Sequence, residues 1–451
     1  MIMKPRTRRQ KAIIRRRIFL SVCAIALVAL IAFTVALVSL ITKDLGENKK
    51  QNTPSTTSTV SETQEPKLVS TVNVLSIGDI MCHAPQLKGG YNQSTDSYDF
   101  SPFFKEISKY FKTADLSIGN LEVTFGGKEN GGYRGYPSFN TPDELADNIK
   151  NAGISLLLTA NNHSYDTGLS GLVRTASVLS EKGISYTGTR QTANESKYII
   201  KDVKGIKIGV ANFTYETTNA ESESGRKYLN GNKLASEAND LINSFSYTNI
   251  ENFYAQAESI INDMQKNGAE FISFYLHWGE EYQLKENTWQ KSIAQKLCNL
   301  GVDIIIGSHP HVVQPIELLY SEDGQNTTVC AYSLGNAVSN QRRELISSCP
   351  TGHTEDGLIF TYTLEKYSDG TVTLLKVDAI PTWVNKYQGN NGSQYTIYPI
   401  ESADFGSTNY QFTGANLTDT KESFERTKNI ISEGLTSCQN HLGCEVRFKE
   451  E

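Results

Sequence analysis

The chain has 451 residues, of which 38% are hydrophobic and 20% are charged, so its composition is that of a folded globular protein and excludes a largely disordered one. Its formal net charge is −6, and removing the eight Lys or Arg of residues 1–17 leaves −14 for the remainder. This acidic remainder argues against nucleic acid as a partner, because surfaces that bind nucleic acid are basic.

An uncharged apolar run follows the basic tail. Residues 18–41 are 24 positions without a charged side chain, and a helix that rises about 1.5 Å per residue would cross a hydrocarbon core of roughly 30 Å over that length. A signal peptide has a shorter apolar core, of roughly 7–15 residues. We therefore predict an uncleaved transmembrane helix at 18–41, a cytoplasmic tail at 1–17, and an extracytoplasmic main domain of a single-pass membrane protein.

Beyond the apolar run, the chain divides into a spacer, a large domain and a tail. Residues 42–67 are polar and rich in Thr and Ser, which predicts a flexible spacer. Residues 68–400 alternate short apolar runs with helical patterns, which predicts an α/β sandwich. Residues 401–451 are patterned more weakly and form a C-terminal extension with one expected helix near 419–434. The expected buried strands cover 71–79, 114–120, 154–160, 206–213, 270–278 and 302–308.

Two helices and one turn are expected in detail. Residues 141–153 predict a helix with Thr141 as N-cap and Gly153 as its stop. The helix expected at 287–301 places four apolar residues on one face, namely Trp289, Ile293, Leu297 and Leu300. Asp369 and Gly370 predict a hairpin turn.

Six cysteines follow the predicted span, and two interpretations of them remain open. Cys438 could pair with Cys444, and Cys330 with Cys349, because an extracytoplasmic domain can keep disulfides. Alternatively, all six are free thiols.

Polar side chains gather where the expected strands end. Ligands of α/β sheets bind beyond the carboxyl ends of the strands, and five of the seven histidines lie there. Each such residue taken alone is explained as well by a turn or a cap, but their joint placement indicates a site. The residues at these ends are Asp79, His83, Asn120, Glu122, Asn161, Asn162, His163, Asp166, His277, Glu280, Glu281, His309 and His311.

This mixture of donors predicts a divalent metal. Imidazole nitrogen combined with carboxylate and amide oxygen suits Mn, Zn or Fe better than Ca. Pro310 between His309 and His311 favours a turn, which would aim the two imidazoles at different positions of one metal cluster. Cys82 is a weaker ligand candidate than His83, because an incidental cysteine is the commoner case.

Six blocks in this order resemble the CapA family of bacterial capsule-synthesis proteins, named for poly-γ-glutamate capsule. They cover about residues 72–380 and read GDIM, GNLE, ANNHSYDTG, LHWGEEY, GSHPHVVQP and YSLGNAVSNQ. CapA proteins in turn are similar to calcineurin-type metallophosphoesterases. The resemblance implies a four-layer α-β-β-α sandwich of the metallophosphoesterase type, preceded here by one transmembrane helix.

The resemblance also implies a metal site, carried over residue by residue. It makes metal ligands of Asp79, Asn162, His277, His309 and His311, and it makes His163, oriented by Asp166, an acid–base catalyst. There are two departures. Met81 stands where the esterases have a histidine, and Asn120, which stays a candidate ligand, stands where they have the aspartate that bridges two metals. One or two ions are therefore expected, with Glu122 or His83 as compensating ligands.

Three functions follow as expectations. The first is assembly of a capsule or other cell-surface polymer, with an anionic polymer or its precursor, and membrane polymer-synthesis proteins, as partners. The second is hydrolysis of a phosphate ester by a metal-dependent phosphoesterase, and the third is a surface binding module with a structural metal. The expected substrate pocket is formed by Asn161, Trp278, Glu280, Tyr282, Gln314, Asn336 and Gln341.

Overall fold

Two β-sheets lie face to face in the computed structural model, which describes residues 65–218, 226–402 and 414–448. The described residues from Pro66 onward form one unit. The predicted tail, transmembrane helix and nearly all of the spacer (1–17, 18–41 and 42–64) lie outside the described residues. Within the described ranges, no helix is long and apolar enough to cross a membrane.

The first sheet has eight strands in the order β19-β18-β17-β1-β4-β5-β6, with β16 also paired to β1. Strands β1, β4, β5 and β6 are parallel, whereas β17, β18 and β19 are antiparallel. Their bounds are β1 Leu68–Ile80, β4 Leu116–Leu121, β5 Leu156–Leu158, β6 Ser185–Thr187, β16 Asn336–Val338, β17 Asp356–Tyr367, β18 Val372–Gly389 and β19 Gly392–Pro399.

The second sheet has seven strands in the order β11-β8-β12-β13-β15-β14, with β7 paired to β8. Its centre is parallel and only β7 and β14 run antiparallel to their neighbours. The bounds are β7 Tyr198–Val203, β8 Ile206–Tyr215, β11 Ser244–Phe245, β12 Phe271–His277, β13 Ile304–Ser308, β14 Ile316–Tyr320 and β15 Thr327–Ala331. Two short hairpins, β2 Tyr91–Asn92 with β3 Ser97–Tyr98 and β9 Tyr228–Leu229 with β10 Asn232–Lys233, lie outside the two sheets.

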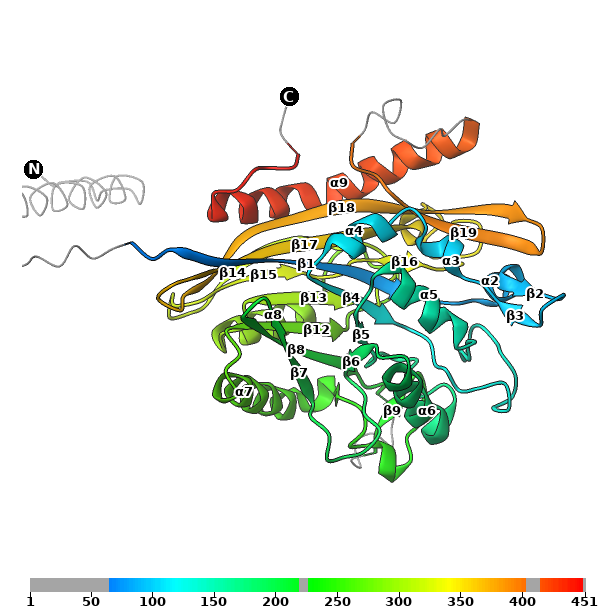
Figure 1. Cartoon of the computed structure of the whole chain (residues 1–451), viewed down its shortest axis with the longest axis horizontal. Coiled ribbons are helices and arrows are strands. Elements are labelled where there is room, and N and C mark those ends of the chain that lie inside the picture. Colours follow the sequence, from blue (N-terminus) through cyan, green and yellow to red (C-terminus); the bar gives the residue numbers. More distant parts are fainter. Residues whose placement is uncertain (1–64, 219–225, 403–413, 449–451) are drawn as a thin grey trace, which may run out of the picture. The chain divides into compact units, whose positions relative to one another are not determined.

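Helices cover the outer faces of the sheets, so the layers follow the expected order of helix, sheet, sheet and helix (Figure 1). Apolar residues of both sheets share one core, in which Ile118 and Leu156 belong to the first sheet and Ile208 and Ile306 to the second. The helices are α2 Ala84–Gly90, α3 Ser101–Phe104, α4 Ser108–Thr113, α5 Glu144–Ala152, α6 Gly168–Glu181, α7 Ile250–Lys266, α8 Thr288–Asn299 and α9 Gly414–Leu442, with short 3₁₀ turns η2 Ser236–Ala238, η3 Tyr247–Asn249 and η4 His353–Glu355.

All six expected buried strands are confirmed, because parallel strands covered on both faces need continuous apolar runs. The predicted N-cap is wrong: Asp143 occupies the N-cap position of helix α5, and Thr141 lies in the preceding loop, where its backbone N–H donates to the carbonyl oxygen of Thr124. Gly153 ends that helix with φ 102° as predicted. In α8, Ile293 and Leu297 are buried, but Trp289 is 41% exposed.

All six cysteines beyond residue 65 are free thiols, so neither of the two disulfides considered from the sequence is present. Five of these cysteines are buried. Four of them lie within the apolar cores of the unit, namely Cys82, Cys298, Cys330 and Cys438.

Helix α9 in the C-terminal extension packs against β18 and β14 (Figure 1). Ile431 and Leu435 are fully buried in the core between the sheets. The Arg426 guanidinium holds the buried carboxylate of Asp356 with two hydrogen bonds of 2.8 and 2.9 Å. The described part of the extension therefore continues the core of the preceding domain.

Candidate metal centre

Polar side chains from both sheets converge at the carboxyl ends of parallel strands. Asp79 and Asn120 are neighbours on β1 and β4, while His277 ends β12. Glu122 follows β4, and His309 follows β13. All of these side chains are buried. The expectation that strand ends gather the site is confirmed for this group, because the two sheets bring these ends together.

A glycine fixes the first of these strand ends. A Cβ on Gly78 would lie 1.9 Å from the carbonyl oxygen of Gly335, so only glycine allows this approach. The neighbouring backbone N–H of Asp79 donates to the same oxygen at 3.0 Å. Asp79 is thereby paired with Asn336 of β16. Asn336 also contacts the His311 ring.

Asp79 orients the ligands around it. Its Oδ1 accepts a hydrogen bond from Asn120 Nδ2 at 2.7 Å, and its Oδ2 lies 3.3 Å from the backbone N of His309 and 3.1 Å from His311 Nδ1. Asn336 Oδ1 lies at 3.1 Å from the same Nδ1. A proton on Nδ1 would leave His311 Nε2 free as a ligand, as in carboxylate–histidine–metal arrangements.

Glu122 is the least compensated group of the cluster. It is fully buried, and among the described residues neither of its oxygens accepts a hydrogen bond. Burial, and then the charge of Asp79, raise the pKa of Glu122 well above its usual value. A buried carboxylate without donors is costly, so this position calls for a cation, or for a proton shared with Asp79.

Two of the three imidazoles are neutral and therefore suited to bind metal. Burial, followed by the charge of neighbouring imidazoles, lowers the pKa values of His277 and His309 well below the usual range, so both stay neutral at physiological pH. Burial alone would lower the pKa of His311, but the hydrogen bond and charge of Asp79 outweigh it and raise that pKa. His309 Nδ1 is buried without a partner among the described residues.

The backbone at the two final histidines is strained. His309 has φ 98° and His311 has φ 56°, in the left-handed region that side-chain-bearing residues rarely adopt. Such conformations cost of order 1–3 kcal/mol each and persist where the surroundings fix them. Here Pro310 O accepts the backbone N–H of Tyr282 at 2.8 Å. The expected turn is confirmed, and it points the two rings into one cluster.

His163 and Asp166 form a separate pair beside the cluster. His163 Nδ1 lies 2.7 Å from Asp166 Oδ2, which also accepts the backbone N–H of Phe139 at 2.6 Å. The ring of Phe139 meets that of His163 edge-on at 4.7 Å. Asn162, the preceding residue, brings its Oδ1 to 2.9 Å from His277 Nε2. Asn162 therefore contacts His277 of the buried cluster, whereas His163 is held by Asp166.

His83 and Cys82 lie outside the two ligand groups found in the described residues. His83 is half-buried, its Nδ1 lies 3.3 Å from the backbone N of Asn340, and burial lowers its pKa to about 4. Cys82 is buried in the apolar core, as is Met81. Of the two compensating ligands considered from the sequence, the structure places Glu122 in the cluster and His83 at its edge.

Two of the expected pocket residues do not line the site, which corrects the prediction for them. Trp278 is fully buried with its indole N–H on Tyr332 O at 2.9 Å. Gln314 is buried too, and its Nε2 donates to Gln283 O at 2.8 Å. Both side chains complete the hydrogen bonding of the core behind the strand ends.

Four of the other five expected pocket residues lie near the cluster, namely Asn161, Tyr282, Asn336 and Gln341. Asn161 accepts the backbone N–H of His163 at 3.1 Å and orders that loop. Gln341 Nε2 donates to Tyr282 Oη at 3.2 Å, and the Tyr282 ring centroid lies 6.2 Å from that of His311. Glu280 is exposed. The Asn336 amide makes its hydrogen bonds to neighbouring protein groups, among them His311, so Asn336 is a positioning residue.

Three neighbours of the cluster were missed in the sequence. Ser308 Oγ lies 3.1 Å from His277 Nδ1, and the Tyr215 ring centroid lies 4.7 Å from that of His309. Ser308 and Tyr215 each end a parallel strand, so inspecting the carboxyl ends of the strands, which identified the histidines, would have identified these two residues as well. Phe139 lies in a loop and carries no such signal.

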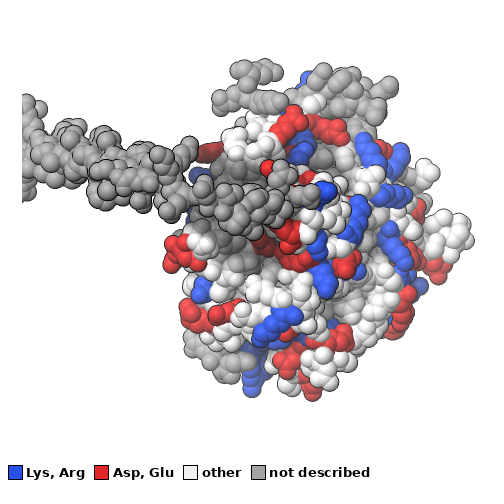
Figure 2. Space-filling model, turned by 60° about the vertical axis from the view of Figure 1, so that its left-hand side comes forward, with Lys and Arg blue, Asp and Glu red and all other residues white. Residues whose placement is uncertain are grey.

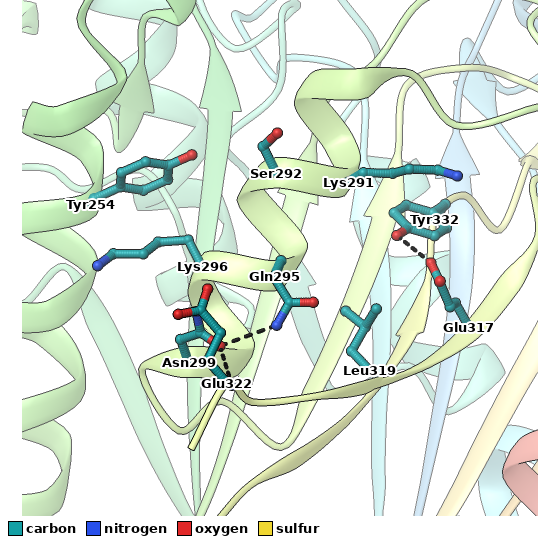
Figure 3. A pocket seen from close by; sticks show the side chains of 10 residues that line it. All are labelled: Tyr254, Lys291, Ser292, Gln295, Lys296, Asn299, Glu317, Leu319, Glu322 and Tyr332. Carbon is teal, nitrogen blue, oxygen red and sulfur yellow. Dashed lines mark hydrogen bonds between the residues drawn. The ribbon is translucent and has the colours of Figure 1, made fainter. Parts of the chain in front are cut away.

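The surface has a groove that is separate from the buried cluster. A groove of about 500 Å³ between α7, α8 and β14 is shown in Figure 3, where Tyr332 Oη donates to Glu317 at 2.7 Å. It contains Lys291 and Lys296 but none of the buried imidazoles. On the face shown in Figure 2, basic and acidic side chains are interspersed.

The donor set fits a divalent ion. Two ligand atoms at roughly 2.1 Å from one ion, at the tetrahedral angle, lie roughly 3.4 Å apart. Glu122 Oε1 lies 3.5 Å from His277 Nε2 and 3.7 Å from His311 Nε2. These separations are too long for good hydrogen bonds but match co-ligands, so the residues present suit Mn, Zn or Fe.

Comparisons with known proteins agree with the resemblance of the six sequence blocks to the CapA family. Residues 73–341 match the family model described as "Bacterial capsule synthesis protein PGA_cap". The chain is 28% identical over 277 residues to "Capsule biosynthesis protein CapA" of Bacillus anthracis, covering 59% of each chain. It is 26% identical over 318 residues to "PGA biosynthesis protein CapA" of Bacillus subtilis (strain 168), covering 69% of this chain and 73% of that protein.

The chain thus spans about three fifths of the length of the first of these relatives. Among solved structures, the protein TT1561 of Thermus thermophilus aligns with a TM-score of 0.33 and 9% identity over 64% of this chain and 94% of that one.

Proposed function

Because the chain belongs to the PGA_cap family of bacterial capsule synthesis proteins, we propose that it acts in the synthesis of a capsule or a related cell-surface polymer. The observation that carries the proposal is that the matched residues, 73–341, contain the whole buried cluster of imidazoles and carboxylates. Both Bacillus relatives bear names of capsule or PGA biosynthesis. A polymer resembling poly-γ-glutamate is the corresponding substrate class.

The proposed location is the outer face of the cell membrane. The predicted transmembrane helix at 18–41 would anchor the protein, and the spacer at 42–67 would hold the domain away from the lipid. The proposed partners are the anionic polymer or its precursor and membrane proteins that synthesise it. An acidic domain repels an anionic polymer, so a bound divalent ion would supply the attractive charge.

The cluster supports a role for that ion. Asp79, Glu122, His277, His309 and His311 would hold divalent metal, and Asp79 also orients His311. A bound divalent ion lowers the pKa of a water molecule to about 7 and stabilises negative charge on a reacting group.

A second candidate function is hydrolysis of a phosphate ester, and the contact between His163 and Asp166 favours it. The 2.7 Å contact of Asp166 with His163 Nδ1 fixes the proton of the neutral ring on that nitrogen. The other ring nitrogen can then carry a proton to or from a substrate, as a general acid or base does. Phe139 packs against the ring and holds its orientation.

Deletion of the gene tests the proposed function. Loss or shortening of the surface polymer is expected, and complementation by the wild-type protein should restore it. The variant His309→Ala should fail to complement, while His441→Ala, which removes an exposed histidine of α9, should complement fully. An unchanged surface polymer in the deletion strain would refute the proposal.

The hydrolase candidate has its own test. The purified protein, loaded with Mn²⁺ or Zn²⁺, is assayed on a chromogenic phosphodiester. We expect His163→Ala to abolish turnover while it still binds metal, because His163 is not among the ligand groups. No turnover by the metal-loaded wild-type protein would sink this candidate and leave the role in polymer synthesis standing.

A further inference from the structure

Two groups of potential ligands in the buried cluster share one residue. The first group is Glu122, His309 and His311, and the second is Asp79, Glu122 and His277. Within each group the ligand atoms lie within 4.8 Å of one another, and every member is buried. Glu122 is the residue common to both groups, so its carboxylate lies where two ion positions would meet.

The two oxygens of Glu122 are both free to bind cations. Neither accepts a hydrogen bond in the described part of the chain. Asp79, the other buried carboxylate of the cluster, differs, because Asn120 Nδ2 contacts its Oδ1 while His311 Nδ1 and the His309 N–H contact its Oδ2. A carboxylate with two unpartnered oxygens can give one oxygen to each of two ions, and Glu122 alone combines this freedom with contacts to both groups.

Glu122 also faces imidazoles of both groups. Its Oε1 lies 3.5 Å from Nε2 of His277 and 3.7 Å from Nε2 of His311. Two atoms that each lie roughly 2.1 Å from one ion are separated by similar distances. One oxygen of the shared carboxylate therefore lies close to an imidazole of each group, and its other oxygen, Oε2, has no hydrogen-bond partner among the described residues.

Asn120 cannot supply the shared carboxylate. Its Nδ2 is turned towards Asp79 Oδ1 at 2.7 Å and lies 3.4 Å from His277 Nδ1. An amide NH₂ donates hydrogen bonds, and Asn120 Oδ1, which is buried without a partner among the described residues, is a neutral ligand at most. Asn120 therefore holds Asp79 in place, and the negative charge between the two groups has to come from another residue.

We propose that Glu122 is the bridging carboxylate of a two-ion centre, with one divalent ion held by Glu122, His309 and His311 and the other by Asp79, Glu122 and His277. This proposal rests on the metal-binding role proposed above and specifies its stoichiometry. The bridging carboxylate therefore comes from Glu122, two positions after Asn120 in the chain.

The experiment counts ions on the full-length protein purified in detergent and loaded with Mn²⁺. Elemental analysis should give two Mn per chain in the wild type, and the electron paramagnetic resonance spectrum should show two coupled Mn²⁺ ions. Glu122→Gln should bind fewer than two ions and lose the coupled spectrum. His309→Ala and Asp79→Asn should each retain one uncoupled ion, because each removes a ligand of only one group.

The control is Glu258→Gln, which removes an exposed carboxylate from α7 and should keep two coupled ions. Circular dichroism checks that each variant is folded. If Glu122→Gln does not fold, Glu122→Asp keeps the charge but shortens the side chain, and it should weaken or abolish the coupling while the control keeps it.

Three outcomes would overturn the proposal. One Mn per wild-type chain would show that a single ion occupies the cluster. A coupled pair that survives in Glu122→Gln would assign the bridge to another group. No bound metal in the wild-type protein would refute metal binding by the cluster. Since ions are counted without any assay of polymer, a failed deletion phenotype would refute the proposed function and leave the ion count intact.

Discussion

Asn336→Ala tests whether Asn336 positions the cluster or contacts a substrate. The side chain is fully buried, and its Nδ2 has three acceptors: His311 O at 3.2 Å, Gln341 Oε1 at 2.9 Å and Thr354 O at 2.9 Å. The amide has two N–H groups, so alanine removes at least two donations to buried acceptors. At about 1–3 kcal/mol for each unsatisfied group, we expect the free energy of unfolding to fall by about 2–6 kcal/mol.

Metal affinity should fall as well. His311 Nδ1 loses its 3.1 Å contact with Asn336 but keeps that with Asp79. Removal of one partner behind a metal ligand typically costs about 10–100-fold in affinity. Urea unfolding followed by circular dichroism measures the first effect, and metal titration measures the second.

The matched control is Asn252→Ala, at an exposed position of α7, which should change stability by less than about 0.5 kcal/mol. The reasoning would be refuted by an Asn336→Ala protein that unfolds within about 1 kcal/mol of the wild type and binds metal equally well. Such a result would restore the pocket role that the sequence predicted for Asn336.

Three further predictions concern the packing of α9, the titration of Asp303 and the binding of metal. In Gly434→Ala of α9, the new Cβ would lie 1.6 Å from Ile316 O, so stability should fall by about 1–3 kcal/mol although alanine favours helices. Ser437→Ala, exposed on the same helix, should not destabilise, and equal urea midpoints for the two variants would contradict the close packing. Burial raises the pKa of Asp303 to about 7, above its unfolded value of about 3.9. The contribution of Asp303 to stability is therefore complete below about pH 4 and lost as the pH rises through about 7. Asp303→Asn should gain stability relative to the wild type from about pH 4 to about pH 8, and a difference in unfolding free energy that is constant with pH would refute this. Removing metal with EDTA should lower the Tm, and adding back Mn²⁺ or Zn²⁺ should restore it, because an ion at a hundredfold excess over its Kd stabilises by about 2.7 kcal/mol. A Tm that does not respond to the chelator would count against metal binding by the cluster.

Much of the site was predictable because the sequence pattern is local. Apolar runs followed at once by polar residues mark the carboxyl ends of parallel strands, and His277 and His309 were found in this way. The same rule would have found Tyr215 and Ser308. Trp278 was misassigned, because its place directly after His277 in the chain does not reveal that its side chain points into the core.

The C-terminal extension shows a second limit of sequence pattern. Its weak periodicity predicted one helix near 419–434, and the structure has a helix from Gly414 to Leu442. What the pattern could not reveal is the partner of that helix. Ile431 and Leu435 enter the core between the sheets, and Gly434 is needed because the helix approaches the backbone of β14 closely.

The sequence by itself determined where six central buried strands lie, which strand ends carry the donors and which family the blocks resemble, because these depend on patterns a few residues long. The tertiary structure decided which donors are already satisfied. Asn120 and His277 are 157 positions apart and Asp79 and His311 are 232 apart, so only the packing of two sheets brings them into contact. That packing leaves Glu122 without a donor and gives Asn336 its place behind His311, since hydrogen-bond satisfaction depends on neighbours that the chain order does not specify.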